Sequence, residues 1–312
     1  MAESDTRIGI LRGRENSFPD AFIEKVNGMG KGVSAEYVQL GGTKLNEDVP
    51  YRVIVDRMSH EVPYYEVYLK MVALQGTYCI NNTFWRCADD KFFGYAVAEK
   101  LGIASPKTVV LPNKSYVEDV TGDSLRNLWP VDFAGLLDYV GTPCIMKPAF
   151  GGGWKNVNKI HSLDELMEKY NDSGTLTLML QEFISWDVFI RIPTVGRRWA
   201  RAIRYDPAPL AQGGYDQDYD ALGAKLRDEA EELSLRFNQA LGYDMNAVEF
   251  AVKDDRFYAI DLTNYTPDFD HRSLKDAHFP WVVEKMASYA VEKALSDEPT
   301  PNVPDWKALL LR

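Results

Sequence analysis

The N-terminal part of the chain alternates between strand-like and helix-like segments, and this alternation constrains the fold more than any other feature. Strand-like segments fall at residues 7–11, 35–40, 51–55 and 78–81, and helix-like segments at residues 18–29, 63–74 and 89–101. The segment 51–55 is nearly all apolar, which is typical of a strand covered on both faces. Alternation at this pitch predicts an α/β fold with an open parallel sheet.

The pattern changes near residue 105, where prolines punctuate shorter elements. Strand-like segments at 109–111, 144–147 and 176–183 and helix-like segments at 131–139 and 162–170 indicate a small second lobe. Antiparallel-type strands follow at 188–195, 199–205, 247–252 and 256–261, with a polar loop at 206–220 and helices at 221–241 and 280–295. Because 312 residues exceed what one core usually holds, we predict three domains, at 1–104, 105–183 and 184–312.

The composition excludes several classes of partner. A formal net charge of -11 argues against nucleic acid or an anionic membrane, and no apolar run approaches the ~20 residues that span a bilayer. Cys79, Cys87 and Cys144 show no metal-ligand spacing and are expected to be buried free thiols, as in a reducing cytosol. The polar, acidic N-terminal residues are unlike a signal peptide. We therefore expect a cytoplasmic protein.

A glycine-rich loop follows one lysine and precedes another. Lys147 ends an apolar strand, and the loop that follows contains Gly151, Gly152, Gly153 and Lys155. Glycines let the backbone approach a polyphosphate, and lysines supply compact positive charge for the same oxygens. The loop lacks the order of a Walker P-loop, and a flexible hairpin is the alternative interpretation. The combination suggests a nucleoside triphosphate.

Two carboxylates fall on the last predicted hairpin. Glu249 and Asp261 occupy adjoining strands, where they could lie side by side, and Asn264 follows closely. Two acids held together in a largely apolar sheet repel each other unless a cation bridges them, and Mg²⁺ suits oxygen ligands combined with substrate phosphates. The alternative is a pair of exposed strand acids, each paired with lysine or arginine. We predict a metal site here, for Mg²⁺ or alternatively Mn²⁺.

The segment between the glycine loop and these acids predicts a nucleotide hinge. An apolar strand runs through Gln181 and Glu182 into an exposed hinge at Phe183 and Ile184, whose backbone groups could meet the edge of an adenine ring. Asp187, just beyond, could accept hydrogen bonds from ribose hydroxyls, with a turn or cap role as the alternative.

Two arginines follow on paired strands. Arg191 could face solvent, whereas the apolar neighbours of Arg204 suggest that strand alternation directs its side chain into the cleft. An arginine beside two carboxylates and a triphosphate would stabilise developing negative charge.

In their order, these parts resemble the ATP-grasp superfamily, most closely its RimK-like, glutathione synthetase and D-alanine–D-alanine ligase groups. The resemblance rests on Lys91 before a Leu-Gly-Ile-x-x-Pro-x-Thr turn at 101–108, Lys147 before the glycine loop, a Gln-Glu-x-Ile hinge at 181–184, an arginine strand ending in Val-Gly at 191–196, Arg204, and the final acids with Asn264. It covers residues 88–270, and the region before it resembles the pre-ATP-grasp domain. It implies a parallel N-terminal sheet followed by a two-lobed, α+β ATP-grasp fold.

The resemblance implies an enzyme that uses Mg·ATP to join a carboxylate to an amine through an acylphosphate, releasing ADP and phosphate. By the same resemblance Lys91 and Lys147 would hold phosphates, and Arg191 and Arg204 would be catalytic. The family usually ends on Glu-x-Asn, whereas this chain has Asp261-Leu262-Thr263-Asn264, so either Thr263 or Asn264 is the third metal ligand. The alternatives are an ATP-grasp small-molecule kinase and a non-catalytic ATP-binding sensor of the synapsin type.

Substrate-binding residues are expected beyond the carboxyl ends of the parallel strands. Arg57, Ser59 and His60 follow the third strand, and Asn82 follows the fourth. Arg57 could hold a carboxylate and Ser59 or His60 could orient a polar group, with a turn or cap role as the alternative for His60. The resemblance implies amino acids, peptides or small carboxylates as substrates. Homodimers are common among such folds, and no feature of the sequence decides the oligomeric state.

Overall fold

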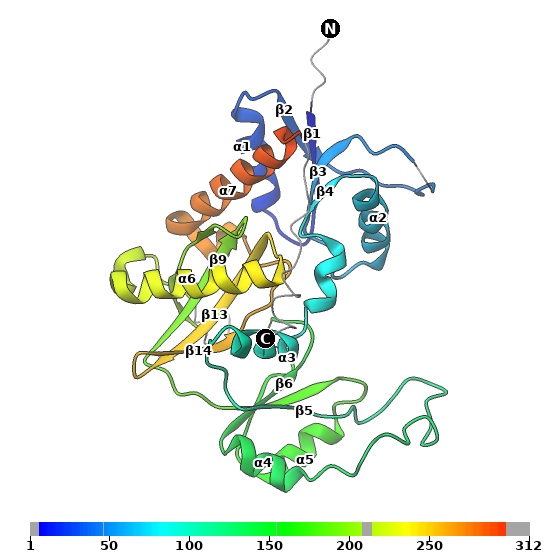
Figure 1. Ribbon diagram of the computed structural model, residues 1–312, viewed down its shortest axis with the longest axis vertical. Coiled ribbons are helices and arrows are strands. Elements are labelled where there is room, and N and C mark those ends of the chain that lie inside the picture. The colour runs from blue at the N-terminus through cyan, green and yellow to red at the C-terminus, as the bar shows by residue number, and fades with distance from the viewer. Residues whose placement is uncertain (1–5, 46, 154, 208–213, 298–312) are drawn as a thin grey trace. The chain divides into compact units, whose positions relative to one another are not determined.

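The computed structural model describes residues 6–45, 47–153, 155–207 and 214–297 (Figure 1). Its N-terminal elements alternate as predicted: β1 (Thr6–Leu11), α1 (Phe18–Gly28), β2 (Val33–Tyr37), β3 (Tyr51–Asp56), α2 (Pro63–Leu74) and β4 (Tyr78–Ile80). The four strands form a parallel sheet in the order β2-β1-β3-β4. The predicted parallel sheet is therefore confirmed.

Helices cover both faces of this sheet, which explains why residues 53–55 of its strand β3 are all apolar. Val53, Ile54 and Val55 of β3 are fully buried. Ile54 packs in one cluster with Tyr68 and Leu69 of α2, while α1 and α7 (His271–Leu295) pack together and contact the sheet. Figure 1 shows α1 and α7 side by side, away from α2. Alternate side chains of β3 therefore pack against helices on opposite faces of the sheet.

The middle of the chain builds an antiparallel sheet. After η1 (Thr83–Ala88) and α3 (Lys91–Lys100) come β5 (Thr108–Val110), α4 (Phe133–Val140), β6 (Cys144–Pro148), β7 (Asn158–Ile160), α5 (Leu163–Asn171) and β8 (Leu178–Glu182). The strand order is β5-β8-β6-β7, and each neighbouring pair is antiparallel. Ser162 caps α5 as predicted, because its hydroxyl accepts a hydrogen bond from Glu165 N at 3.2 Å.

The third sheet belongs to the C-terminal part of the chain. Its elements are β9 (Val188–Val195), β10 (Trp199–Ala200), β11 (Ile203–Asp206), β12 (Gly214–Tyr215), η2 (Tyr219–Leu222), α6 (Gly223–Leu241), β13 (Met245–Lys253) and β14 (Arg256–Asp261), followed by α7. The strand order is β12-β11-β9-β13-β14, with β10 paired to β9. The predicted loop at 206–220 contains β12, and its residues 208–213 lie outside the described part. Helix α7 begins at His271, earlier than predicted, and departs from helical geometry at Lys275.

The chain divides into two compact units that differ from the three predicted domains. The first unit comprises Met1–Asp89, Phe189–Glu249 and Thr263–Arg312, and the second comprises Asp90–Val188 and Phe250–Leu262. Helix α3 belongs to the second unit, where Lys91 N donates to Ala149 O at 3.0 Å. The end of the last hairpin also belongs to that unit. A prediction that divides the sequence into consecutive domains cannot identify a unit that is built from two separated segments.

Within the described ranges, none of the helices has the length and apolar character that a membrane span requires. Cys79 and Cys144 are buried free thiols, as expected, whereas the side chain of Cys87 lies outside the described part.

Candidate functional site

Two lysines of the second unit converge on the end of β14. Lys91, the first residue of α3, donates from Nζ to Gly151 O at 2.6 Å and lies 3.3 Å from Asp261 Oδ2. Lys147, on β6, donates from Nζ to Ile260 O at 3.0 Å. Asp90 caps α3 by accepting from Phe93 N at 2.6 Å, which fixes where the helix begins and therefore where Lys91 lies. The structure thus brings both predicted phosphate-binding lysines to residues 260–261.

A tyrosine supports the second lysine. The hydroxyl of Tyr95 donates to the same Ile260 carbonyl at 2.5 Å, and the Lys147 ammonium lies 5.5 Å from the centroid of the Tyr95 ring. Lys147 is only 7% exposed. Sequence reasoning missed Tyr95, and its place one turn after Lys91 on α3 was the signal that could have found it.

The glycine loop lies beside these lysines in the second unit. Gly151 and Gly153 have φ values of 79° and 73°, in the left-handed region that favours glycine. All three glycines are exposed, and no heavy atom lies within 4 Å of a Cβ built on any of them. The backbone here can approach a ligand closely. Lys155 is exposed, and its predicted phosphate contact remains a prediction.

The predicted hinge uses its side chains for internal bonds. Gln181 Nε2 donates to Thr108 Oγ1 at 2.9 Å, while Glu182 N donates to Lys107 O at 2.8 Å and Glu182 Oε2 accepts from Lys107 N at 3.1 Å. These bonds tie β8 to the start of β5. The predicted contact with adenine would therefore fall to main-chain groups beyond Glu182.

The hinge backbone fits that role. Phe183 and Ile184 follow the last residue of β8, and no hydrogen bond between described residues involves their main chain. Asp187 instead has an internal partner, because its Oδ2 accepts from Asp254 N at 3.0 Å in the β13–β14 turn. The structure therefore gives Asp187 the turn role named above as the alternative to ribose binding.

Arg191, on β9 of the first unit, forms an ion pair and lies near two tyrosine rings. Its Nη1 lies 3.3 Å from Glu249 Oε1, and its guanidinium lies 5.4 and 5.6 Å from the ring centroids of Tyr205 and Tyr215. Burial alone would lower the pKa of Arg191, but Tyr215, Glu249, Tyr205 and Asp268 together raise that pKa above its usual value. Arg191 is therefore charged. Its Nε is buried and has no hydrogen-bond partner among the described residues.

The prediction that Arg204 faces the carboxylates is wrong. In the β9–β11 pair Arg191 lies opposite Ile203, and Arg204 lies opposite Ile190. Cross-strand partners share a face and successive residues alternate, so Arg204 lies on the face opposite to Arg191 and Glu249. Its side chain is exposed. The three-residue turn at 196–198 sets this register, which the sequence alone did not reveal.

Strand alternation relates Tyr205 to Ile203, whereas Tyr215 depends on a strand pairing inside a segment that the sequence predicted as a loop. Tyr205 lies two residues after Ile203, on the face of Arg191, and Tyr215 lies opposite Tyr205 in the β11–β12 pair. The hydroxyl of Tyr215 is buried and, within the described ranges, has no hydrogen-bond partner.

The predicted metal ligands are divided between the two units. Asp261 belongs to the second unit, and Glu249 and Asn264 belong to the first. Asp261 Oδ1 is buried without a partner among the described atoms, as expected of a carboxylate that has room for a cation. No group of three His, Cys, Asp or Glu side chains suited to a metal occurs in the described part of the chain. The structure therefore shows a carboxylate with an unpaired oxygen in the second unit, and the three-ligand Mg²⁺ site stays a prediction.

The third ligand is also constrained by the backbone. Asn264 N donates to Asn246 Oδ1 at 2.7 Å, which fixes the chain just after β14, and the Asn264 side chain is half-buried. Thr263 is 6% exposed. The choice between Thr263 and Asn264 stays open.

The prediction that Arg57 binds a substrate carboxylate is wrong, because the protein itself occupies this guanidinium. Arg57 is 2% exposed, its Nε donates to Glu15 Oε2 at 2.8 Å, and its Nη2 donates to Pro267 O at 2.5 Å. The rings of Phe18 and Phe269 lie 5.2 and 5.1 Å from the guanidinium carbon. Arg57 therefore serves as a buried structural cation.

The other three substrate candidates also have local roles. Ser59 is buried, and its hydroxyl and N–H both donate to Asp56, so the prediction that Ser59 orients a substrate is wrong. Asn82 caps η1, accepting from Phe84 N at 3.0 Å. His60 is exposed beside Glu61, with 3.7 Å between Nε2 and Oε1. A substrate role for Asn82 or His60 stays a prediction.

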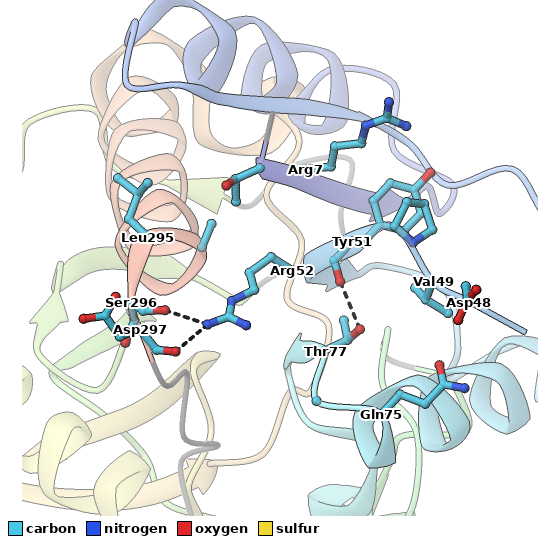
Figure 2. Close-up of a pocket in the computed structure, with 14 residues that line it drawn as sticks. Arg7, Asp48, Val49, Tyr51, Arg52, Gln75, Thr77, Leu295, Ser296 and Asp297 are labelled. Atoms are coloured by element: carbon cyan, nitrogen blue, oxygen red, sulfur yellow. Dashed lines mark hydrogen bonds between the residues drawn. The ribbon is translucent and has the colours of Figure 1, made fainter. Parts of the chain in front are cut away.

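A separate cavity of about 800 Å³ lies in the first unit and contains none of the predicted site residues. Figure 2 shows Arg52 there, donating to the carbonyl oxygens of Ser296 and Asp297 at 2.8 Å each. Thr77 Oγ1 donates to Tyr51 O at 3.0 Å. These polar groups bind the end of α7 and the sheet to each other, which is a structural role.

Solved structures share this architecture over nearly the whole chain. A RimK domain ATP-grasp protein from Sphaerobacter thermophilus matches with a TM-score of 0.64 and 18% identity, over 92% of this chain and 100% of that one. The chain has the ATP-grasp fold. D-Alanine–D-alanine ligase from Bacillus anthracis matches with a TM-score of 0.62 and 18% identity, over 93% of this chain and 98% of that one.

A third ATP-grasp structure completes the comparison. The ATP-grasp ligase PsnB, complexed with a phosphomimetic variant of its minimal precursor, Mg and ADP, matches with a TM-score of 0.62 and 14% identity, over 92% of this chain and 98% of that one. No family model and no curated protein matches the sequence. The predicted resemblance to the ATP-grasp superfamily is confirmed at the level of the fold.

Proposed function

We propose that the protein is an ATP-dependent ligase that joins a carboxylate to an amine through an acylphosphate. One observation carries the proposal. Lys91 and Lys147 converge on the end of β14, where Asp261 keeps a buried carboxylate oxygen without a partner. Two cations and an open carboxylate are the groups that a metal-bound polyphosphate requires.

ATP and Mg²⁺ are proposed as the nucleotide and the metal, with Mn²⁺ as an alternative. The D-alanine–D-alanine ligase of similar fold has been solved with ATP, and PsnB with Mg and ADP. In this chain Asp261 and Glu249, with Asn264 or Thr263, would hold the metal, which would neutralise phosphate charge when bound.

The second unit would bind the nucleotide. Lys91, Lys147 and Lys155 would neutralise phosphate oxygens, and the N–H groups of the glycine loop would approach the same oxygens. The main chain of Phe183 and Ile184 would pair with the edge of adenine. The internal bonds of Gln181 and Glu182 would hold that hinge in place. A ribose contact at Asp187 would require the Asp187–Asp254 bond to be shared.

The chemistry has two balanced steps. A carboxylate oxygen of the first substrate bonds to the γ-phosphorus as the bond to the β-phosphate oxygen breaks, giving an acylphosphate and ADP. The amine then bonds to the acyl carbon, inorganic phosphate leaves, and the nitrogen loses a proton. Arg191, held on one face of its sheet by Glu249 and two tyrosines, would stabilise the charge that develops on the transferred group.

The substrates are proposed by class only. PsnB and the macrocyclase MdnC were solved with precursor peptides, and D-alanine–D-alanine ligase takes its name from an amino acid. Amino acids, peptides and small carboxylates are therefore the classes to test first. The net charge of -11 argues against nucleic acid as a partner. Buried free thiols at Cys79 and Cys144 support action in the cytoplasm.

The test is phosphate and ADP release with Mg·ATP against a panel of amino acids, dipeptides and small organic acids, singly and in pairs. A ligase releases phosphate only when a carboxylate and an amine are both present, and mass spectrometry detects the condensed product. A kinase gives a phosphorylated product with one substrate and no free phosphate. A sensor binds ATP and turns over with no member of the panel.

A further inference from the structure

Two ion pairs, one in each unit, share the same arrangement. In the second unit Lys91 Nζ lies 3.3 Å from Asp261 Oδ2, and in the first unit Arg191 Nη1 lies 3.3 Å from Glu249 Oε1. Each pair joins a cation that the proposed function assigns to phosphate or to developing negative charge with a carboxylate that it assigns to the metal. In the structure, each of these cations is therefore neutralised by a carboxylate that is proposed to bind the metal.

Both pairs are largely shielded from water. The side chains of Lys91 and Asp261 are 9% and 28% exposed, and those of Arg191 and Glu249 are 14% and 16% exposed. Removing one partner from a shielded pair leaves the other charge poorly solvated, which is strongly unfavourable. Surface pairs such as Arg7–Glu36, with side chains 48% and 51% exposed, lack this penalty.

Each pair also keeps one atom unsatisfied. Asp261 Oδ1 and Arg191 Nε are buried, and neither has a hydrogen-bond partner in the described part of the chain. A carboxylate oxygen of this kind attracts a cation, and a guanidinium N–H attracts an anion. Lys147 also lies at this end of β14, where it donates to the uncharged carbonyl of Ile260 at 3.0 Å.

We propose that Lys91–Asp261 and Arg191–Glu249 are exchange pairs that make metal and nucleotide binding interdependent. Within the second unit, Lys91 can turn to a phosphate at low cost only when a cation replaces it at Asp261. Within the first unit, Arg191 meets a corresponding cost when it leaves Glu249. Each pair, within its own unit, therefore penalises a phosphate that arrives without a cation and a cation that arrives without a phosphate. This inference rests on the proposed function and adds a rule for the order of occupancy to it.

The test measures binding rather than turnover. The probe is AMPPNP, an ATP analogue that resists hydrolysis, titrated calorimetrically into the protein with EDTA and then with Mg²⁺. Asp261→Asn should bind metal-free AMPPNP about 10-fold more tightly than the wild type, because Lys91 has already lost its competing carboxylate. With Mg²⁺ present the same variant should bind more weakly than the wild type.

A double-mutant cycle separates exchange from plain repulsion. In a Lys91→Met background, Asp261→Asn should no longer improve metal-free binding, because the cation that it liberates is gone. If the improvement persists in that background, the carboxylate merely repels phosphate and the inference fails. Glu249→Gln and Arg191→Met give a second, independent cycle for the first unit. This cycle replaces the first one if thermal denaturation shows that a Lys91 or Asp261 variant is unfolded.

The outcome also distinguishes the inference from the proposed function. Wild-type protein that binds AMPPNP with Mg²⁺ and shows no coupling in either cycle contradicts only the exchange pairs. Wild-type protein that binds no AMPPNP with Mg²⁺ contradicts the proposed function and the exchange pairs together.

Discussion

Lys91 Nζ lies 3.3 Å from Asp261 Oδ2, so a helix and the end of a strand remote in sequence share one partly buried ion pair. The same ammonium also reaches Gly151 O at 2.6 Å. One lysine therefore links α3, the glycine loop and the last hairpin within the second unit. This is the feature on which the proposed nucleotide chemistry depends most.

Loss of the lysine charge should abolish most turnover. Lys91→Met keeps the length of the side chain but removes the ammonium, and we expect kcat/KM for ATP to fall by about 10²–10³-fold, as when one preorganised donor is lost from an active site. Lys100→Met is the matched control, because Lys100 is the exposed last residue of the same helix. Steady-state phosphate release measures both. Equal activity in the two variants would remove Lys91 from the site.

Substitutions of Arg191 and Arg204 should have very different effects on kcat. Arg191→Lys removes the guanidinium that Glu249 and two tyrosines hold in place, and we expect at least a 100-fold loss of kcat, or about 2.7 kcal/mol of transition-state stabilisation. Arg204→Lys should change kcat by less than about 3-fold, because exposed surface substitutions have small effects. The kinetics of both variants are compared under saturating ATP. A larger loss in Arg204→Lys would show that the sequence-based role of Arg204 was right.

Local patterns predicted much of the fold, because they depend on neighbouring residues. Pro63 begins α2 as expected for a proline in a first helical turn, and the helix ends at Leu74, just before Gly76, whose φ is 98°. The nearly all-apolar segment 51–55 forms most of strand β3, and its composition alone was enough to predict a strand covered on both faces. Lys91, Lys147 and the hinge were predicted from motifs that are likewise short and local, and their roles stay predictions.

The errors at Arg204 and Arg57 share a different cause, since each depends on pairing with another segment of the chain. Whether Arg204 faces the carboxylates depends on strand register, which the turn before it sets. Arg57 follows a parallel strand as a ligand-binding residue would, but Glu15 and Pro267 O had already taken its donors. Asp187 accepts a hydrogen bond from Asp254, a turn residue 67 positions later in the sequence. No pattern within one segment reveals such pairings.

The structural role of Arg57 predicts a stability effect. Arg57→Leu leaves Glu15, whose side chain is 12% exposed, without its cation, and we expect the free energy of unfolding to fall by about 3–5 kcal/mol. Arg7→Leu breaks an exposed pair with Glu36 at 3.7 Å and should cost less than about 1 kcal/mol. Urea denaturation gives both values. A small loss for Arg57→Leu, with impaired substrate binding, would restore its predicted role.

Asp244 predicts a distinct dependence of stability on pH. It is 2% exposed and accepts hydrogen bonds from Tyr78 and Tyr289 at 2.9 and 2.8 Å. Burial raises its pKa from 3.8 to about 6, although both tyrosine hydrogen bonds act to lower it. Between these values the folded protein holds a proton that the unfolded chain has released, so stability falls as pH rises through this window.

The matched variant isolates this contribution. The free energy of unfolding of the wild type, minus that of Asp244→Asn, should decrease by about 2 kcal/mol between pH 4 and pH 7, since each pKa unit is worth about 1.4 kcal/mol and pH 4 already lies above the unfolded pKa. Urea denaturation at intervals of pH measures the difference. A difference that stays constant or grows with pH would mean that Asp244 is ionised throughout.

The most direct test of the central claim follows oxygen from substrate to phosphate. Once the panel has identified a carboxylate and an amine, the carboxylate is labelled with ¹⁸O and the released phosphate is examined by mass spectrometry. An acylphosphate route transfers one labelled oxygen from each labelled carboxylate into phosphate, and we predict that result. Unlabelled phosphate released together with the condensed product would contradict the acylphosphate and the ligase mechanism proposed for this chain.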